Sequence, residues 1–462
     1  MTTPDQPETG ETKELRQLLR EFHRDGFFQW QFSDKIHKER WSTYCYDEEK
    51  HWGGFSREPF DPSTYTLPDW AIGPFEKYAN NPVFAPDPDG WDCGHFGGGS
   101  HNGSILHKDG RLYYIYRGEF PMPDEPRFAS RRETGFDYLC DIGVAVSDDG
   151  INFERVAGPL MRGPEDWMFS FEDVNCVRHD GRYYMFHNRW DWERYRDPSV
   201  CGVYLAVSDD LLHWEQKGLA FPNATRIHRN GTVLQDPHNN AVRDAEGRFV
   251  MYVNDGLIGY SDDLVHWESK ELSSVWPGGE CAVAIADYHP ANKDHIVLFT
   301  GGNHTGHFYA KGEVLFSKRD PETPLEWLPR PVLAADPKFP YEDGYAADSP
   351  HRPVSYWRDT VFFCGMTVFK NQWYAYYGGS EYYTCLATAP VRRMQTGESG
   401  IAQEPGLAVE TANREMITQS SLKRGVSDQI MRPLTPRSTD IRRRNERCPT
   451  KEQAEALFAV RS

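Results

Sequence analysis

The sequence of 462 residues lacks the features that would place it in a membrane or on nucleic acid. It has no apolar run near the roughly 20 residues that a membrane-spanning helix requires, and the segment from Met1 has neither the basic nor the apolar part of a secretion signal. Basic residues are outnumbered, with 51 Lys and Arg against 69 Asp and Glu and a net charge of −18. We therefore expect a cytoplasmic protein without nucleic-acid or membrane partners.

Cysteine is also sparse. The nine cysteines are scattered, odd in number and include no CxxC pair. This pattern argues against a disulfide framework and against a zinc site built on cysteine. We interpret the cysteines as buried, reduced thiols.

Aromatic residues are abundant, and a short phrase recurs among them. It appears as SDDGINFE at 147–154, SDDLLHWE at 208–215 and SDDLVHWE at 261–268, with a degraded copy from Ser317 to Trp327. The copies lie about 50 to 60 residues apart, which is the period of a β-propeller blade. The Ser-Asp-Asp segment is typical of a structural turn, in which the Asp side chain bonds nearby backbone N–H groups.

Five units with the same order of strands and turns follow one another along residues 66–390. Asp109-Gly110, Asp180-Gly181 and Glu246-Gly247 are typical of hairpin turns within these units. The sequence therefore predicts an all-β fold, a five-bladed β-propeller. Residues 1–65 are predicted to form an N-terminal helical extension, which could mediate homo-oligomer contacts or simply pack on its own domain. Residues 391–462 are predicted to be a poorly ordered C-terminal tail.

The first strand of each propeller blade lines a central channel, so residues at these strands should converge. The corresponding clusters are 97–102, 171–175, 235–240, 278–281 and 341–344, the last with Asp348. Four of these five clusters carry a carboxylate. Cleavage of a glycosidic bond requires one carboxyl as acid and another as base, which favours that chemistry here.

Glu172 and Asp173 are the strongest candidates, because apolar neighbours and a like-charged partner raise the pKa of a carboxyl. Alternatively, one of the two only orients a neighbouring strand. Glu280 follows two glycines and enters an apolar strand, where an unused charge would be costly. Asp236, near His238, could bind sugar hydroxyls or serve as an alternative base.

Histidines near the blade entrances could in principle assemble a metal site: His95, His101, His238, His304 and His307. The spacing of His304 and His307 matches no known zinc pattern. We predict no metal and no cofactor.

These motifs resemble the five-bladed propeller glycosidases, and within them glycoside hydrolase family 130, the β-mannoside phosphorylases and hydrolases. Families 43 and 32, which share the propeller, are more distant. The similar stretches span roughly residues 70–390 and include 81–84, 142–150, 171–173, 361–366 and 373–389.

The resemblance implies that Asp173 is the general acid. Val174 and Asn175 replace the Pro and Arg of the family's Glu-Asp-Pro-Arg motif, and that Arg helps to hold phosphate in the phosphorylases. His238-Asn239 stand where the family has Lys-Asn, and Asn254 stands at a later basic position, whereas Arg117 matches. Losing most of the cations that would hold a dianion favours water as the nucleophile.

We therefore predict an inverting, exo-acting glycoside hydrolase that takes an oligosaccharide or glycoside, with Asp173 as acid and Glu280 as the base for water. The alternatives are a phosphorylase and a non-catalytic carbohydrate-binding propeller. The predicted substrate-binding residues are His101, Asn102, Arg117, Glu172, Asn175, Trp190, His238, Asn239, Asp343 and Asp348.

Overall fold

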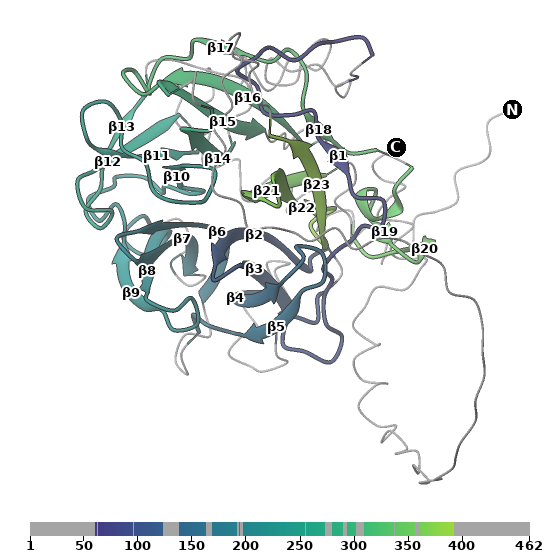
Figure 1. The fold of residues 1–462 in the computed structure, drawn as a ribbon. Helices are drawn as coiled ribbons and strands as arrows, with labels where there is room; N and C mark the ends of the chain where they lie inside the picture. Colours follow the sequence, from purple (N-terminus) through teal and green to yellow (C-terminus); the bar gives the residue numbers. More distant parts are fainter. Residues whose placement is uncertain are drawn as a thin grey trace, which may run out of the picture. The chain divides into compact units, whose positions relative to one another are not determined.

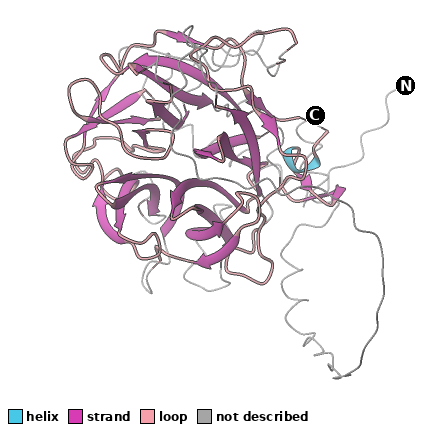
Figure 2. Ribbon diagram, in the orientation of Figure 1, coloured by secondary structure: helices cyan, strands magenta, loops and turns pink. Residues whose placement is uncertain are grey.

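A computed structural model describes residues 61–391, apart from residues 62, 96, 123–137, 163–168, 192–193, 195–196, 255, 273–279, 290–292, 302–308, 337 and 356–359. The described part is built almost entirely of strands, with one helical turn, η3 (Pro340–Glu342) (Figure 2). None of its helices is long and apolar enough to cross a membrane. The predicted N-terminal helix and C-terminal tail lie outside the described residues.

Two antiparallel four-stranded sheets form the first two blades of a five-bladed β-propeller. Blade 1 contains β2 (Ser100–Lys108), β3 (Arg111–Pro121), β4 (Tyr138–Ser147) and β5 (Glu154–Ala157). Blade 2 contains β6 (Phe169–His179), β7 (Arg182–Asp191), β8 (Gly202–Ser208) and β9 (Glu215–Leu219).

The next two blades are joined through a parallel pairing of their inner strands, β10 and β14. Blade 3 contains β10 (Thr232–Gln235), β11 (Phe249–Val253), β12 (Leu257–Ser261) and β13 (Glu268–Glu271). Blade 4 contains β14 (Glu280–Ala286), β15 (His295–Gly301), β16 (Ala310–Ser317) and β17 (Glu326–Trp327), and β18 (Leu333–Ala334) also pairs with β16. A separate hairpin follows, made of β19 (Tyr345–Ala346) and β20 (Ser349–Pro353).

Blade 5 closes the ring with strands from both ends of the described chain. Its strands are β21 (Val361–Phe369), β22 (Gln372–Gly379), β23 (Tyr383–Pro390) and β1 (Glu76–Lys77). Glu76 pairs with Thr388 on β23, so the first strand becomes the outer strand of the last blade. The Lys77 ammonium donates to Glu342 at 2.7 Å and reinforces this closure.

The inner strands β2, β6, β10, β14 and β21 contact one another in ring order, with β21 returning to β2 (Figure 1). Apolar residues from several strands pack between neighbouring blades. Phe186 of blade 2, for example, meets Trp267, which follows the turn of blade 3, with ring centroids 5.6 Å apart. The predicted all-β propeller is confirmed.

The Ser-Asp-Asp segments form the turns that the sequence predicts. The Ser208 hydroxyl accepts the backbone N–H of Leu211 at 2.8 Å, and Asp210 accepts the N–H groups of Leu212 and His213, each at 2.8 Å. Trp214 then donates its indole N–H to the Leu211 carbonyl. The copies from Ser147 and Ser261 repeat the Ser and Asp contacts, and they lie in the scaffold.

A bulge interrupts the inner strands of blades 1 and 2 at matching positions. The pairing register shifts between His101 and Ser104, and again between Glu172 and Asn175. The residues inside these two bulges, Asn102 and Asp173, have φ of 46° and 48°. Bulges re-aim side chains, and left-handed backbone at a non-glycine residue is costly unless surroundings enforce it. The bulged backbone thus sets the directions of the Asn102 and Asp173 side chains, which regular strand pairing would not give.

Candidate active site

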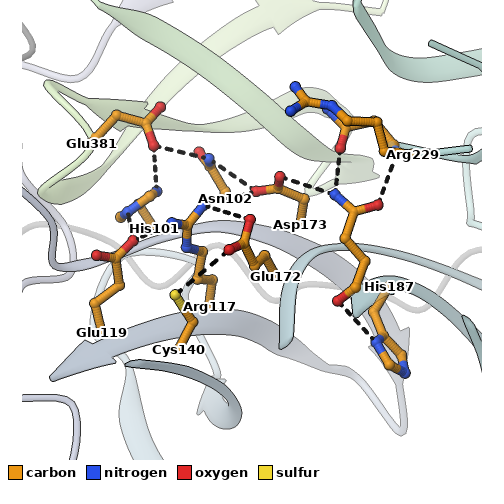
Figure 3. Close-up of polar contacts among 12 residues, drawn as sticks. His101, Asn102, Arg117, Glu119, Cys140, Glu172, Asp173, His187, Arg229 and Glu381 are labelled. Carbon is orange, nitrogen blue, oxygen red and sulfur yellow. Dashed lines mark hydrogen bonds and ion pairs between the residues drawn. The ribbon is translucent and has the colours of Figure 1, made fainter. Parts of the chain in front are cut away.

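Asp173 receives hydrogen bonds from two blades (Figure 3). Its Oδ1 accepts from Asn102 Nδ2 at 3.2 Å and from an Arg117 guanidinium nitrogen at 3.4 Å, both on blade 1. Its Oδ2 accepts from Asn188 Nδ2 at 3.2 Å, on the neighbouring strand β7. The Asp173 side chain is only 8% exposed. Both carboxyl oxygens are therefore held in a defined position.

Arg117 is a buried cation shared by several carboxyl groups. One of its nitrogens lies 2.5 Å from Glu119, and another lies 3.6 Å from Glu172 and 3.4 Å from Asp173. Burial raises the pKa of Glu172 to about 7 against the charge of Arg117, and Asp173 and Glu119 add to the rise. Glu172 is thus a carboxyl that holds a proton near neutral pH.

His101 is fully buried between two acidic side chains, Glu119 at 3.3 Å and Glu381 at 3.6 Å. Burial opposes a charged imidazole, but these two carboxyls outweigh it and raise the pKa of His101. Burial also raises the pKa of Glu381, whose Oε2 accepts from Asn102 at 3.4 Å. His101 and Glu381 therefore line the side of the site next to Asn102.

Glu119 contacts both His101 and Arg117 and so fixes the side chains on this side of the site. Burial alone would raise its pKa, but Arg117 and hydrogen bonds from His101 and His95 hold it well below its usual range. Gly98 makes room for the carboxylate, because a Cβ there would lie 1.8 Å from Glu119 Oε2. The glycine is required by this close approach.

Glu280 begins β14, and its Oε1 accepts from Arg229 at 2.6 Å. Both side chains are almost completely buried, with exposed fractions of 3% for Arg229 and 4% for Glu280. Asn254 holds the two segments together, because its backbone N–H donates to the Arg229 carbonyl and its Oδ1 accepts the N–H of Cys281. Arg229 and Glu280 thus form a fixed ion pair across blades 3 and 4.

Tyr309 lies close enough to both groups of charges to be influenced by them. Burial raises the pKa of its phenol well above the usual value, the carboxylates of Glu280, Glu381 and Asp173 raise it further, and Arg229 opposes the rise. The phenol therefore stays protonated and can donate a hydrogen bond among these acids.

The matching bulge position of blade 3 is Asn230, with φ of 51°, just before β10. Its Oδ1 accepts from Asn188 Nδ2 at 2.6 Å, and its backbone N–H donates to Asn188 Oδ1 at 2.9 Å. The arrangement brings together an acid candidate on blade 2, a paired carboxylate on blade 4, and polar side chains that link them. Such a set of carboxyls suits acid–base cleavage of a glycosidic bond.

Comparison with known proteins agrees with this chemistry. No family model matches the chain. A 1,2-β-oligomannan phosphorylase of Thermoanaerobacter sp. (strain X514) is 28% identical over 293 residues, 61% of this chain and 86% of that protein. A β-1,2-mannobiose phosphorylase of the same organism is 26% identical over 297 residues, again 61% of this chain and 86% of that protein.

A solved structure shares the fold with a TM-score of 0.56, at 24% identity, covering 71% of this chain and 97% of that one. Its description states that the GH130 family of mannoside phosphorylases contains glycoside hydrolases that target β-1,2-mannosidic linkages in Candida mannan. The chain resembles family 130 of the glycoside hydrolases. At this general level, the protein is a glycoside-processing enzyme.

The structure brings together several of the residues singled out from the sequence. Asp173, Glu172, His101, Asn102 and Arg117 contact one another directly or through one neighbour. Glu280 lies at the same end of its inner strand, next to Arg229. Their catalytic and binding roles remain predictions.

Asp236, His238 and Asn239 are not part of this group, because they follow β10 whereas Arg229 precedes it. Asp236 caps a turn by accepting the backbone N–H groups of His238 and Asn240 at 2.8 and 2.9 Å. Asn239 is buried and donates to the Met366 carbonyl at 2.9 Å. The cluster around Asp236, predicted to lie at the entrance of blade 3, therefore lies at the opposite end of β10 from Arg229.

Asn175 and Trp190 are placed for packing. Asn175 joins blades 2 and 3, because its Nδ2 donates to Thr232 Oγ1 at 3.1 Å and its Oδ1 accepts the N–H of Val233 at 3.0 Å. Trp190 is fully buried against Cys201 and Ile227. It presents no face on which a sugar could stack.

Asp343 and Asp348 also differ from expectation. Asp343 is half-buried and ends η3, and the exposed Asp348 pairs with Arg352 at 2.8 Å. In that segment the buried carboxyl is Glu342, which accepts from Lys77 and supports ring closure. The carboxyl of blade 5 that reaches the site is Glu381, from the turn between β22 and β23.

Sequence reasoning missed several residues of the site: Glu119, Asn188, Arg229, Asn230, Tyr309 and Glu381. One signal was available. Residues 101–104, 172–175 and 229–232 share an Asn or Asp in second place and a Ser, Asn or Thr in fourth place. Among the described residues, no group of three or more His, Cys, Asp or Glu could hold a metal ion, and His304 and His307 lie outside them.

Proposed function

We propose that the protein is an inverting glycoside hydrolase, with Asp173 as the general acid and Glu280 as the general base that activates water. The observation that carries this proposal is the buried ion pair between Arg229 and Glu280, 2.6 Å apart. A carboxylate held at one inner-strand entrance, with an acid candidate at another, supplies both groups that inversion requires. A phosphorylase has no need for such a base.

The charges around the site support water over phosphate. A phosphate dianion is held by cations that can turn their N–H groups toward it. Arg117 already contacts Glu119, Glu172 and Asp173, and Arg229 contacts Glu280. Phosphate would have to compete with buried carboxylates for both arginines, at a cost in electrostatic repulsion.

A second candidate function, phosphorolysis, is favoured by a different observation. The structure supplies Arg229, a buried cation that sequence reasoning did not include. The site therefore holds two guanidinium groups, those of Arg117 and Arg229. The two sequence relatives are named as phosphorylases. If Glu280 turned away from Arg229, the two arginines could hold a phosphate.

We further propose that the substrate is a β-1,2-mannoside cleaved from its end. This proposal is supported by the names of the relatives, which act on 1,2-β-oligomannan and β-1,2-mannobiose. The site's many hydrogen-bond donors and acceptors suit a ligand covered with hydroxyl groups.

The deciding experiment is incubation of the protein with β-1,2-mannobiose in phosphate-free buffer and in buffer with added phosphate. A hydrolase releases mannose at the same rate in both, and NMR at early times shows the α-anomer. Strict dependence on phosphate, with mannose 1-phosphate as product, would establish the second candidate. Absence of cleavage across a wide panel of glycosides would point to a carbohydrate-binding propeller.

A further inference from the structure

Asn188 is fully buried on β7 and contacts the acid candidate on the neighbouring strand. Its Nδ2 donates to Asp173 Oδ2 at 3.2 Å and to Asn230 Oδ1 at 2.6 Å. Its Oδ1 accepts the backbone N–H of Asn230 at 2.9 Å. An asparagine amide has two donor and two acceptor positions, so both donors of Asn188 are used.

The orientation of the Asn188 amide follows from these contacts. A backbone N–H can only donate, so the oxygen of the amide must face Asn230 and the NH₂ group must face Asp173. Asn102 differs, because no hydrogen-bond partner of its Oδ1 is found among the described contacts. Asn102 can therefore turn its oxygen toward Asp173 Oδ1, whereas Arg117 on the same oxygen and Asn188 on Oδ2 present only donors.

We propose that Asn188 is a positioning residue for the general acid, which holds the carboxyl group of Asp173 in place by donating to Oδ2. This inference rests on the proposed role of Asp173. In the cleavage step the O–H bond of the Asp173 carboxyl breaks and the leaving oxygen gains that proton. The bond from the leaving oxygen to the sugar carbon breaks, and water, which gives a proton to Glu280, forms the new bond to that carbon. Asp173 is left as a carboxylate, and the N–H of Asn188 stabilises the new charge.

Asn230 extends this role across the blades. It orients Asn188, and its chain neighbour Arg229 contacts Glu280. The Arg229–Asn230 segment thus connects to the acid through Asn188 and to the base through the guanidinium. Among its described residues, blade 3 contributes no carboxylate to the site and instead links Asp173 and Glu280.

The test compares Asn188→Ala on two substrates, β-1,2-mannobiose and 2,4-dinitrophenyl β-mannoside. Dinitrophenolate leaves without a proton, so only the disaccharide depends on the acid. We expect kcat on the disaccharide to fall about 10- to 100-fold and kcat on the aryl glycoside to change far less. Equal losses on both substrates would overturn the proposal.

Asn175→Ala is the matched control, because Asn175 is also a buried amide between blades 2 and 3 but contacts Thr232 and Val233 instead of Asp173. It should leave the ratio of the two activities at the wild-type value. A changed ratio in this control would show that loosening the blades is enough, and would also contradict the proposal.

Asn188→Asp gives an independent readout on the disaccharide. It keeps the shape of the side chain but places a second carboxyl against Asp173 Oδ2, so the pair retains a proton to higher pH. The alkaline limb of kcat/KM should move up by about one pH unit or more, and an unmoved limb would contradict the proposal. Asp173→Asn in the same assays distinguishes a failure of the acid assignment from a failure of the role of Asn188. If Asp173→Asn keeps its activity on the disaccharide, Asp173 is not the acid. If Asp173→Asn loses this activity while Asn188→Ala behaves like the wild type, only the role of Asn188 is wrong.

Discussion

Arg229 and Glu280 face each other at 2.6 Å across two blades, and each is almost completely buried. The base candidate is therefore bound to a buried cation that could otherwise attract an anionic nucleophile. The first prediction follows from this pairing. Glu280→Gln should lower hydrolysis of β-1,2-mannobiose by about 10²- to 10⁴-fold, the usual contribution of a general base.

The same variant should bind inorganic phosphate more tightly than the wild type, because Arg229 loses the carboxylate of Glu280 as a competing acceptor. Isothermal calorimetry with phosphate checks this outcome. If the wild type binds phosphate as tightly as Glu280→Gln does, the ion pair does not exclude the anion and the phosphorylase becomes the better proposal.

Asp173 and Asp236 are predicted to differ sharply when each is changed to Asn. Asp173→Asn should lower kcat on the disaccharide by about 10²- to 10⁴-fold, with little change in melting temperature. Asp236→Asn alters only a turn, so kcat should stay at the wild-type value. A large loss of kcat in Asp236→Asn would show that Asp236 takes part in the site.

The raised pKa of Glu172 predicts that the stability of the folded protein depends on pH. Burial raises its pKa to about 7 in the folded state, above the value of about 4.3 in an unfolded chain. The folded state thus binds the proton more tightly, and this contribution to stability is present at low pH and is lost as pH rises through about 7. Glu172→Gln should therefore gain stability relative to the wild type between pH 5 and pH 8.

Thermal unfolding at several pH values measures this difference. Asp148→Asn is the control, because Asp148 is an exposed carboxylate that pairs only at the surface with Arg111. Its melting temperature relative to the wild type should change far less with pH. A Glu172→Gln difference that is constant from pH 5 to pH 8 would contradict the prediction.

Lys77 should matter for stability and not for chemistry. Lys77→Met removes the cation beside Glu342, whose side chain is completely buried, and leaving a buried charge unpaired costs about 3 to 5 kcal/mol. Chemical denaturation should show a loss of this size. The double variant Lys77→Met/Glu342→Gln should recover part of it, and a purely additive double variant would show that the two side chains are not coupled.

The repeat made the scaffold predictable, but the site was less so. Ser147, Ser208 and Ser261 mark equivalent turns because each repeats the same local hydrogen bonds, and local contacts leave a sequence signature. In blades 1 and 2 the bulge residue also stands at a constant distance before the Asp-Gly turn, so Asn102 and Asp173 were found.

Blade 3 breaks this regularity. The turn from Asp236 to Asn240 is inserted after β10. The carboxylate nearest the expected position, that of Asp236, therefore lies at the wrong end of the strand. Arg229 and Asn230 carry no acidic group and drew no attention. Glu381 comes from the turn between the two middle strands of blade 5, β22 and β23, and only the three-dimensional closure of the ring brings it to His101.

The outer strand of blade 5 comes from the beginning of the described chain, and its other three strands come from the end. On the ribosome, where the amino-terminal part emerges first, Glu76 and Lys77 must wait unpaired until Thr388 has been synthesised. Four blades can assemble as they appear, but the site, which draws on Glu381 from the last one, is completed only after that blade has been synthesised. A nascent or prematurely ended chain would therefore carry both an open sheet edge and an unfinished catalytic centre.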